Sequence, residues 1–317
     1  PSAPARDWAR VQATVETTPT TRRGDAIDDS VVLISADGQT GWILGADNQA
    51  GLRQYDFDGT EQQIVPVGRL NNIDAVTQGE SRYLVAATNR TTIAIDLFEA
   101  DLETTRLEHV ASIPLDFEDP YGFCMASDDN STMLFAGDKA GQLQRWHVDK
   151  DLEARLTCQW QFDSLTEGCT FDEVENRLYV GEEDVGVWSV DPESNERSLV
   201  AEVDGKYLVA DVEGVEIYRG QNERYLVVSS QGDNSFIVYS LPEVEPLLKF
   251  SVEDNLAGGV DAVSETDGIA LLAQPLPGYP QGVFVAQDGH NLAPQGGQNF
   301  KVVDWAAIQA LIDETPD

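Results

Sequence analysis

The sequence predicts an all-β protein built as a six-bladed β-propeller, and three observations predict it. First, a unit of one short apolar strand, a turn rich in Gly, Asn or Asp, and a second strand occurs six times in the 317 residues. Second, the copies recur at intervals of roughly 40–60 residues, which suits a four-stranded propeller blade. Third, β-branched and aromatic residues alternate with a period of two inside the copies, as they do in strands.

Each copy is interpreted as one blade, and the copies follow one another without a Pro- or Ser-rich linker. In chain order they read GWILGADNQAGLRQYDFDG, RYLVAATNRTTIAIDLFEAD, TMLFAGDKAGQLQRWHVD, NRLYVGEEDVGVWSVDPE, RYLVVSSQGDNSFIVYSLPE and QGVFVAQDGHNLAPQGGQNFKVVDW. We expect a helix only near residues 305–312. The sequence therefore predicts one domain over residues 1–317, with its core over about 18–308. The ring closes if the first and last blades share strands, and the site is expected where six strand ends converge on the channel.

The charge balance excludes one large class of partners. The chain has 56 acidic and 20 basic residues and a formal net charge of -36, so it repels nucleic acids at long range. Such an excess of carboxylates is typical of a solvated surface in a salty medium, or of oxygen ligands for hard cations such as calcium.

Cysteine use and hydropathy predict no further cofactor and no membrane span. The three cysteines, Cys124, Cys158 and Cys169, are odd in number and lack metal-ligand spacing, so we expect free buried thiols and no disulfide framework or zinc site. No apolar run approaches the roughly 20 residues that a membrane helix needs. The start at Pro1 without a charged and apolar leader indicates that any signal peptide has been removed.

Several catalytic patterns are missing from the sequence. The three histidines, His109, His147 and His290, do not lie in the surroundings of a phosphatase nucleophile, and the loop of the Cys-based phosphatases is absent. There is no GxSxG elbow, and the GDKAGQ and GADNQAG turns are too short for phosphate-binding P-loops.

Carboxylate chemistry remains, because acidic residues recur at predicted strand ends and turns. They are Asp25, Asp28, Asp29, Glu167, Glu182, Glu183, Asp211, Glu213, Asp261 and Asp267. Carboxylates that face one channel mouth from different blades repel one another, and calcium, with about six to eight oxygen ligands, relieves that repulsion. The alternative for any single residue is a turn-forming role, since Asp and Gly are common where strands reverse.

At these residues the chain resembles the β-propeller phytases. The family's features include an Asp-Asp pair near the start, an NN-(F/V/I)-D segment, an EG-containing turn and a VAQDG segment near the end. In this chain they read DAIDDS, GRLNNIDAV, TEGC with GEED sixteen residues on, ADVEG, and GVFVAQDGHN before QNFKVVDW. The similarity runs over about residues 18–308.

The resemblance implies a fold, a cofactor and a set of roles. Its active-site calcium ligands would be Asp28, Tyr121, Glu167, Glu183, Glu213 and Asp267. Arg90 and Lys139 would hold substrate phosphates. Structural calcium ions would bind Asp29, the pair Asp211 and Gln231, and the trio Asp261, Asp288 and Asn291. Bound calcium would also stabilise the fold by mass action.

The chain departs from the family pattern at a few positions. Asn48 and Gln49 stand where the first blade usually has a lysine, and Ala140 stands where a glutamate usually follows Lys139. Ala270 replaces an aspartate that is common after the TDGI segment. The loss of one phosphate contact costs roughly 10–100-fold in rate or affinity, so a weakened enzyme is one expectation.

Three functions follow from these observations. The first is a calcium-dependent phosphomonoesterase, of the 3-phytase type, that hydrolyses phytate (myo-inositol hexakisphosphate) to lower inositol phosphates and inorganic phosphate through metal-activated water. The second is a low-activity propeller that binds calcium phytate and assists a second, tandem phytase domain. The third is a protein-binding scaffold, the commonest use of propellers. We favour the enzyme, and expect a monomer that is secreted or periplasmic.

Overall fold

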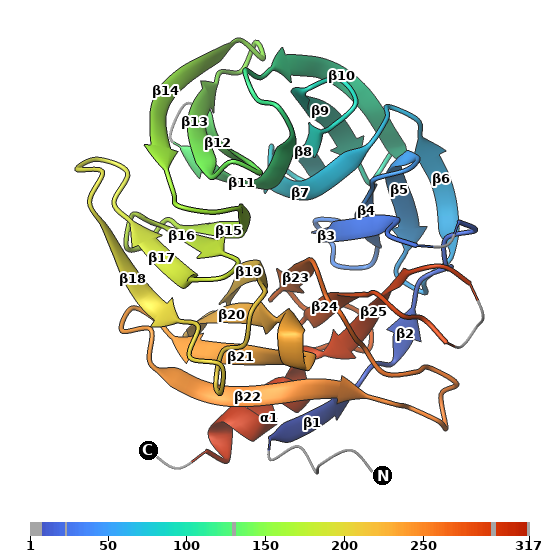
Figure 1. Ribbon diagram of the computed structural model, residues 1–317. Coiled ribbons are helices and arrows are strands. Elements are labelled where there is room, and N and C mark those ends of the chain that lie inside the picture. The colour runs from blue at the N-terminus through green and yellow to red at the C-terminus, as the bar shows by residue number, and fades with distance from the viewer. Residues whose placement is uncertain (1–7, 23, 129–130, 293–295, 316–317) are drawn as a thin grey trace.

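The computed structural model describes residues 8–22, 24–128, 131–292 and 296–315, and it forms a ring of six small β-sheets (Figure 1). Within each of the four-stranded units, neighbouring strands are antiparallel. The predicted six-bladed β-propeller is confirmed. Residues 293–295 of the sixth repeat copy lie outside the described part of the chain.

Four blades consist of consecutive strands, which run in chain order from the innermost strand outward. The first is β3 (Ile27–Ile34), β4 (Gly41–Asp47), β5 (Gly51–Asp56) and β6 (Glu61–Val65), and the second is β7 (Leu70–Thr77), β8 (Arg82–Asn89), β9 (Ala94–Asp101) and β10 (Arg106–Pro114). The third is β11 (Pro120–Asp128), β12 (Ser131–Asp138), β13 (Gln142–Val148) and β14 (Ala154–Gln161), and the fourth is β15 (Thr166–Asp172), β16 (Arg177–Glu182), β17 (Gly186–Val190) and β18 (Arg197–Glu202).

The last two blades recruit the N-terminal segment, as ring closure requires. The fifth is β19 (Val212–Arg219), β20 (Arg224–Ser230), β21 (Ser235–Ser240) and β22 (Pro246–Glu253), with β1 (Ala9–Gln12) added in parallel at its outer edge. The sixth is β23 (Ile269–Leu272), β24 (Val283–Asp288) and β25 (Asn299–Asp304), completed by β2 (Val15–Glu16). The first and last parts of the chain thus share one blade, and the ends of the ring are joined by backbone hydrogen bonds.

Two short helices complete the described part of the chain. The 3-10 helix η1 (Gln231–Asp233) connects β20 and β21, and α1 (Trp305–Asp313) follows β25, where a helix is predicted. The side chain of Asp304 caps α1 by accepting a hydrogen bond from the backbone N–H of Ala306 at 3.0 Å. No helix among the described residues is long and apolar enough to cross a membrane.

The core lies between blades because each strand buries alternate side chains against the neighbouring sheet. Between the first two blades, Leu44 packs with Val85 and Phe98, and all three are fully buried. The Tyr218 ring stacks on Trp305 of α1 with centroids 4.0 Å apart, which fastens the helix to the fifth blade. This packing holds the innermost strands in fixed positions around the ring.

The prediction of free cysteines is wrong for two of the three. Cys124 on β11 and Cys169 on β15 form a disulfide with Cα atoms 5.5 Å apart, although 45 positions separate them in the sequence. The innermost strands of the third and fourth blades contact each other directly, so the topology makes a pair that sequence spacing does not indicate. Cys158 remains a free thiol.

Loss of this disulfide is expected to destabilise the protein by about 2–4 kcal/mol, because the bond restricts the unfolded chain. The variant C124A/C169A is compared with wild type by urea denaturation, with and without a thiol reductant, and C158A serves as the control for loss of a cysteine. Reductant should lower the midpoint for wild type and C158A but leave the double variant unchanged. Equal midpoints for all three proteins under both conditions contradict the prediction.

Candidate active site

The inner strands bring the predicted site residues together through a repeated two-residue motif, in which a predicted ligand is followed by a glycine. Four of the predicted ligands each precede a glycine on or just before an inner strand, in the pairs Tyr121-Gly122, Glu167-Gly168, Glu213-Gly214 and Asp267-Gly268. A Cβ atom at Gly168 would lie 2.1 Å from the carbonyl oxygen of Glu213, and one at Gly122 would lie 2.2 Å from that of Glu167. Only glycine permits such close approach of neighbouring strands, so the preceding side chains converge at one end of the ring.

Three glutamates form the first acidic group. Oxygen atoms of Glu167, Glu183 and Glu213 lie within 4.8 Å of one another, with Glu167 and Glu213 buried and Glu183 half-buried. Burial raises the pKa of both Glu167 and Glu213 well above the ordinary range, and neighbouring carboxylates raise it further. Burial, and then the charges of Asp211 and Asp184, raise the pKa of Glu183 to about 7.

Three aspartates form the second acidic group. Oxygen atoms of Asp25, Asp28 and Asp267 also lie within 4.8 Å of one another. Burial, followed by the charges of Asp267 and Asp25, raises the pKa of Asp28 well above its ordinary value. Burial and then the charge of Asp25 raise the pKa of Asp267 to about 8. Asp25 is not among the predicted ligands, although its place in the run DAIDD is the signal that identifies it.

Two amides hold the carboxylate of Asp267 in place. Gln231 Nε2 donates to Asp267 Oδ1 at 2.7 Å, and Gln287 Nε2 donates to Oδ2 at 3.0 Å. The backbone N–H of Gln231 also donates to the carbonyl oxygen of Asp211 at 3.0 Å. Asp211 and Gln231, predicted as a separate structural site, therefore adjoin the acidic groups, because Gln231 binds Asp267 of the second group and the charge of Asp211 acts on Glu183 of the first.

Tyr121 lies against both acidic groups. The charge of Glu167 first, then burial and the charge of Asp28, raise the pKa of the Tyr121 hydroxyl. A tyrosine so placed stays protonated at neutral pH and keeps a hydroxyl proton to donate.

The donor set fits a hard divalent cation. Within the described part of the chain, Asp28 Oδ2 and Glu213 Oε2 are buried and have no hydrogen-bond partner. A buried carboxylate oxygen without a partner is costly, and each acidic group carries three carboxylates in mutual repulsion. Because all the donors are oxygen atoms, calcium suits these two groups better than zinc or copper.

Both predicted phosphate-binding residues lie beside the acidic groups. The guanidinium of Arg90 lies 5.3 Å from the centroid of the Tyr121 ring, and Lys139 Nζ lies 4.3 Å from it. Arg90 forms a two-bond ion pair with Asp119, in which Nε donates to Oδ1 and Nη2 to Oδ2, each at 2.7 Å. Lys139 Nζ lies 4.0 Å from Asp119 Oδ2. Asp119 thus positions Arg90, a role that was not predicted from the sequence.

Two of the departures from the family pattern, Asn48 and Ala140, lie in turns beside the site. Asn48 Nδ2 donates to Asp28 Oδ1 at 3.5 Å, so the amide touches the second acidic group. The N–H of Ala140 donates to Asp138 Oδ1 at 2.9 Å within the turn that carries Lys139.

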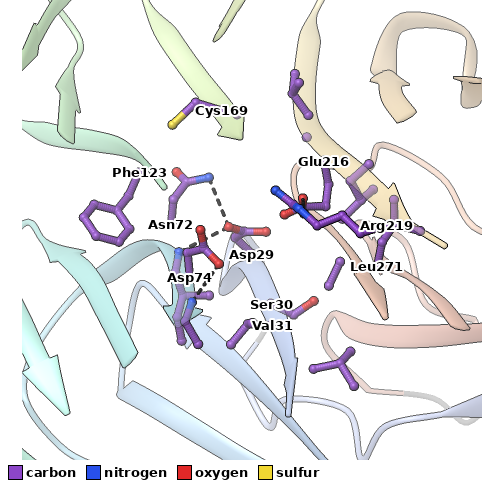
Figure 2. A pocket seen from close by; sticks show the side chains of 18 residues that line it. Asp29, Ser30, Val31, Asn72, Asp74, Phe123, Cys169, Glu216, Arg219 and Leu271 are labelled. Carbon is purple, nitrogen blue, oxygen red and sulfur yellow. Dashed lines mark hydrogen bonds and ion pairs between the residues drawn. The ribbon is translucent and has the colours of Figure 1, made fainter. Parts of the chain in front are cut away.

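Asp29 is directed away from its neighbour Asp28 and lies in a separate cavity. This cavity, of about 130 Å³, also holds Asn72, Asp74, Glu216 and Arg219 (Figure 2). Asp29 Oδ2 accepts hydrogen bonds from the N–H of Ile73 at 3.2 Å and from Asn72 at 3.4 Å. Burial raises its pKa to about 7. Asp29 is therefore not part of either acidic group.

A lysine lies among the residues predicted to bind a third structural calcium. Lys301 is fully buried, and its Nζ lies 2.9 Å from Asp288 Oδ2 and pairs with Asp261 Oδ1. Nζ also donates to the carbonyl oxygens of Asp261 and Ala262. Asn291, in the loop that follows Asp288, is nine-tenths buried. Lys301 was not predicted from the sequence, where its signal is one charged residue in the apolar strand NFKVVD.

Comparisons with known proteins agree with this geometry. A family model described as Phytase matches residues 2–317. A curated 3-phytase from Bacillus subtilis (strain 168) is 30% identical over 333 residues, which cover 97% of this chain and 87% of that protein. A chain in the crystal structure of a nidogen/laminin complex superposes with a TM-score of 0.52 at 14% identity, covering 71% of this chain and 79% of that chain. The last similarity shows the fold alone.

Proposed function

Since the chain belongs to the phytase family, we propose that it is a calcium-dependent phosphoric monoester hydrolase that converts phytate to lower inositol phosphates and inorganic phosphate. The observation that carries the proposal is the meeting of the two acidic groups with Arg90, Lys139 and Tyr121 at one end of the ring. A polyanionic substrate needs cations for binding, and carboxylates alone would repel it.

The two acidic groups are the residues that would hold the catalytic calcium ions. They comprise the predicted ligands Asp28, Glu167, Glu183, Glu213 and Asp267, together with Asp25, whose carboxylate lies beside those of Asp28 and Asp267. Bound calcium would neutralise phosphate charge and lower the pKa of water that attacks phosphorus. We also propose structural calcium ions at three further places. Their ligands would be Asp29, the pair Asp211 and Gln231, and the trio Asp261, Asp288 and Asn291.

The chain's own side chains bind and orient the substrate around that chemistry. Lys139, whose side chain is 43% exposed, provides a mobile positive charge for a phosphate oxygen. Arg90 is held in place by Asp119, and its positive charge attracts the phosphates of the substrate. Its remaining donor is Nη1, which donates to Asn71 at 3.3 Å in this structure. The protonated Tyr121 hydroxyl is a neutral donor under the influence of both acidic groups.

A second candidate is a phytate-binding propeller with little turnover that assists a tandem phytase domain. The observation in its favour is the amide of Asn48 beside Asp28, at the position where the family usually has a lysine. Substrate capture would then survive through the acidic groups and Lys139, while the rate would fall.

We propose further that the protein acts outside the cytoplasm, secreted or periplasmic, and as a monomer. The Cys124–Cys169 disulfide supports an oxidising compartment, and the net charge of -36 suits a salty medium. Both acidic groups and the basic side chains of Arg90 and Lys139 come from one chain, which supports a site that is complete in a monomer.

The proposed function predicts that purified protein releases phosphate from phytate with calcium, and that a calcium chelator lowers the release by at least about 100-fold. The measurement is colorimetric assay of inorganic phosphate, with calcium added back in excess of chelator as the control for reversibility. Tight binding of calcium phytate by calorimetry without release would favour the second candidate. Release that is unaffected by chelator would rule out both.

A further inference from the structure

The site presents fewer free cations than its sequence indicates. The Arg90 side chain is 10% exposed, and its guanidinium is bound to Asp119 through two nitrogens and to Asn71 through the third. The first-blade turn carries Asn48 and Gln49 in place of a lysine. Among the predicted phosphate-binding residues, Lys139 alone has an exposed and mobile charge. A further cationic side chain beside the site would add a charge-assisted contact to a substrate with several phosphates.

Arg69 lies over that same turn. It precedes β7, and its side chain is exposed. Its Nε donates to the carbonyl oxygen of Asn48 at 3.3 Å, and the Asn48 amide in turn donates to Asp28. The Arg69 guanidinium is therefore attached to the turn where the lysine is missing, one residue away from the second acidic group.

The backbone places Arg69 next to Arg90. The N–H of Arg90 donates to the carbonyl oxygen of Arg69 at 2.7 Å, and the N–H of Arg69 donates to Thr91 Oγ1 at 2.9 Å. The hydrogen bonds of Arg90, followed by the charges of Arg90, Lys139 and Arg69, lower the pKa of Asp119. Arg69 thus belongs to the same basic cluster, which consists of Arg69, Arg90 and Lys139.

Arg69 differs from Arg90 in the donors that it leaves free. Within the described residues, the Arg69 guanidinium donates one side-chain hydrogen bond, from Nε. Nη1 and Nη2 therefore remain for an external acceptor. A guanidinium offers two parallel N–H donors to a phosphate monoester, which a lysine does not.

On the basis of the proposed function, we propose that Arg69 is a substrate-binding residue that holds a phosphate of an inositol polyphosphate and replaces the missing first-blade lysine. The Arg69 backbone is held by hydrogen bonds with Arg90 and Thr91, and its Nε is held by the carbonyl oxygen of Asn48, so Nη1 and Nη2 are the donors left for a phosphate.

The test uses the variants R69Q and R69K, with R155Q as the charge-matched control on the exposed outer strand β14. Calorimetry measures binding of myo-inositol hexakissulfate in calcium, a sulfate ester that a phosphatase does not hydrolyse. R69Q is expected to bind about 10–100-fold more weakly, R69K to lose less, and R155Q to match wild type. Adding N48K to R69Q is expected to recover part of the affinity, since it returns a cation to the same turn.

The outcomes separate this inference from the proposed function. Affinity of R69Q within twofold of wild type overturns the role of Arg69, whether or not the wild type releases phosphate. Weaker binding by R69Q, with no phosphate release from wild type, supports Arg69 as a ligand-binding residue and removes the hydrolase proposal. Wild type that neither binds the sulfate ester nor releases phosphate overturns both. Far-UV circular dichroism and thermal unfolding of R69Q confirm that a loss of affinity is not a loss of fold.

Discussion

Calcium-free protein is expected to lose stability as the pH rises from about 5 to 8, with a fall in melting temperature on the order of 10 °C. The folded pKa values of Glu183 and Asp29 are about 7 and that of Asp267 is about 8, whereas unfolded carboxyls titrate near about 4. Between these limits the folded state holds more protons than the unfolded state, so the free energy of unfolding decreases with rising pH.

Stability falls with rising pH because the pKa values of these carboxyl groups are higher in the folded state than in the unfolded state. Stability is fully present below the unfolded pKa, where both states are protonated, and is lost as the pH rises through the folded pKa. Calcium bound to the acidic groups takes the place of those protons and stabilises the fold by mass action. Its stabilising effect should therefore be largest at the upper end of this pH range.

Differential scanning fluorimetry measures the melting temperature from about pH 5 to pH 8, with chelator and with excess calcium, and so tests this pH dependence. The control is magnesium at equal ionic strength, which separates specific binding from screening of the net charge. Equal melting temperatures with chelator and with calcium at pH 8 contradict the assignment of calcium to the acidic groups.

The substitution Glu213→Gln is expected to lower kcat by at least about 100-fold, since it removes a buried charged ligand from the first acidic group. It should also raise the melting temperature of calcium-free protein near pH 8. Burial and neighbouring carboxylates raise the pKa of Glu213, so a neutral amide relieves repulsion that the ionised group imposes. Lower activity and higher calcium-free stability in one variant is a pairing that simple misfolding does not produce.

The measurements are steady-state kinetics with calcium phytate and thermal unfolding with chelator, and Glu153→Gln on the surface before β14 is the matched control. Calcium should stabilise the E213Q variant less than it stabilises wild type. Wild-type kcat in E213Q would show that Glu213 is not part of the catalytic metal site. Lower melting temperature both with and without calcium would attribute the effect to packing instead.

The sequence by itself determined the architecture. Apolar and polar residues alternate in a strand because its side chains repeat every two residues. Turns select particular residues because of their local backbone geometry. Strands and turns can therefore be predicted from the sequence without knowledge of tertiary contacts. For the same reason the helix near residues 305–312 and the joining of the first and last strands were predicted and confirmed.

The tertiary structure alone decided which of those residues share a site. Asp28 and Asp29 are adjacent in sequence at an irregularity in the pairing of β3 with β4, yet one joins the second acidic group and the other lines a separate cavity. Cys124 and Cys169 meet because their blades are neighbours in the ring. Lys301 reaches Asp261 across 40 positions of chain, and Arg69 reaches the turn of the preceding blade. Each of these contacts depends on how blades pack around the ring, which is a property of the closed fold and not of any local segment.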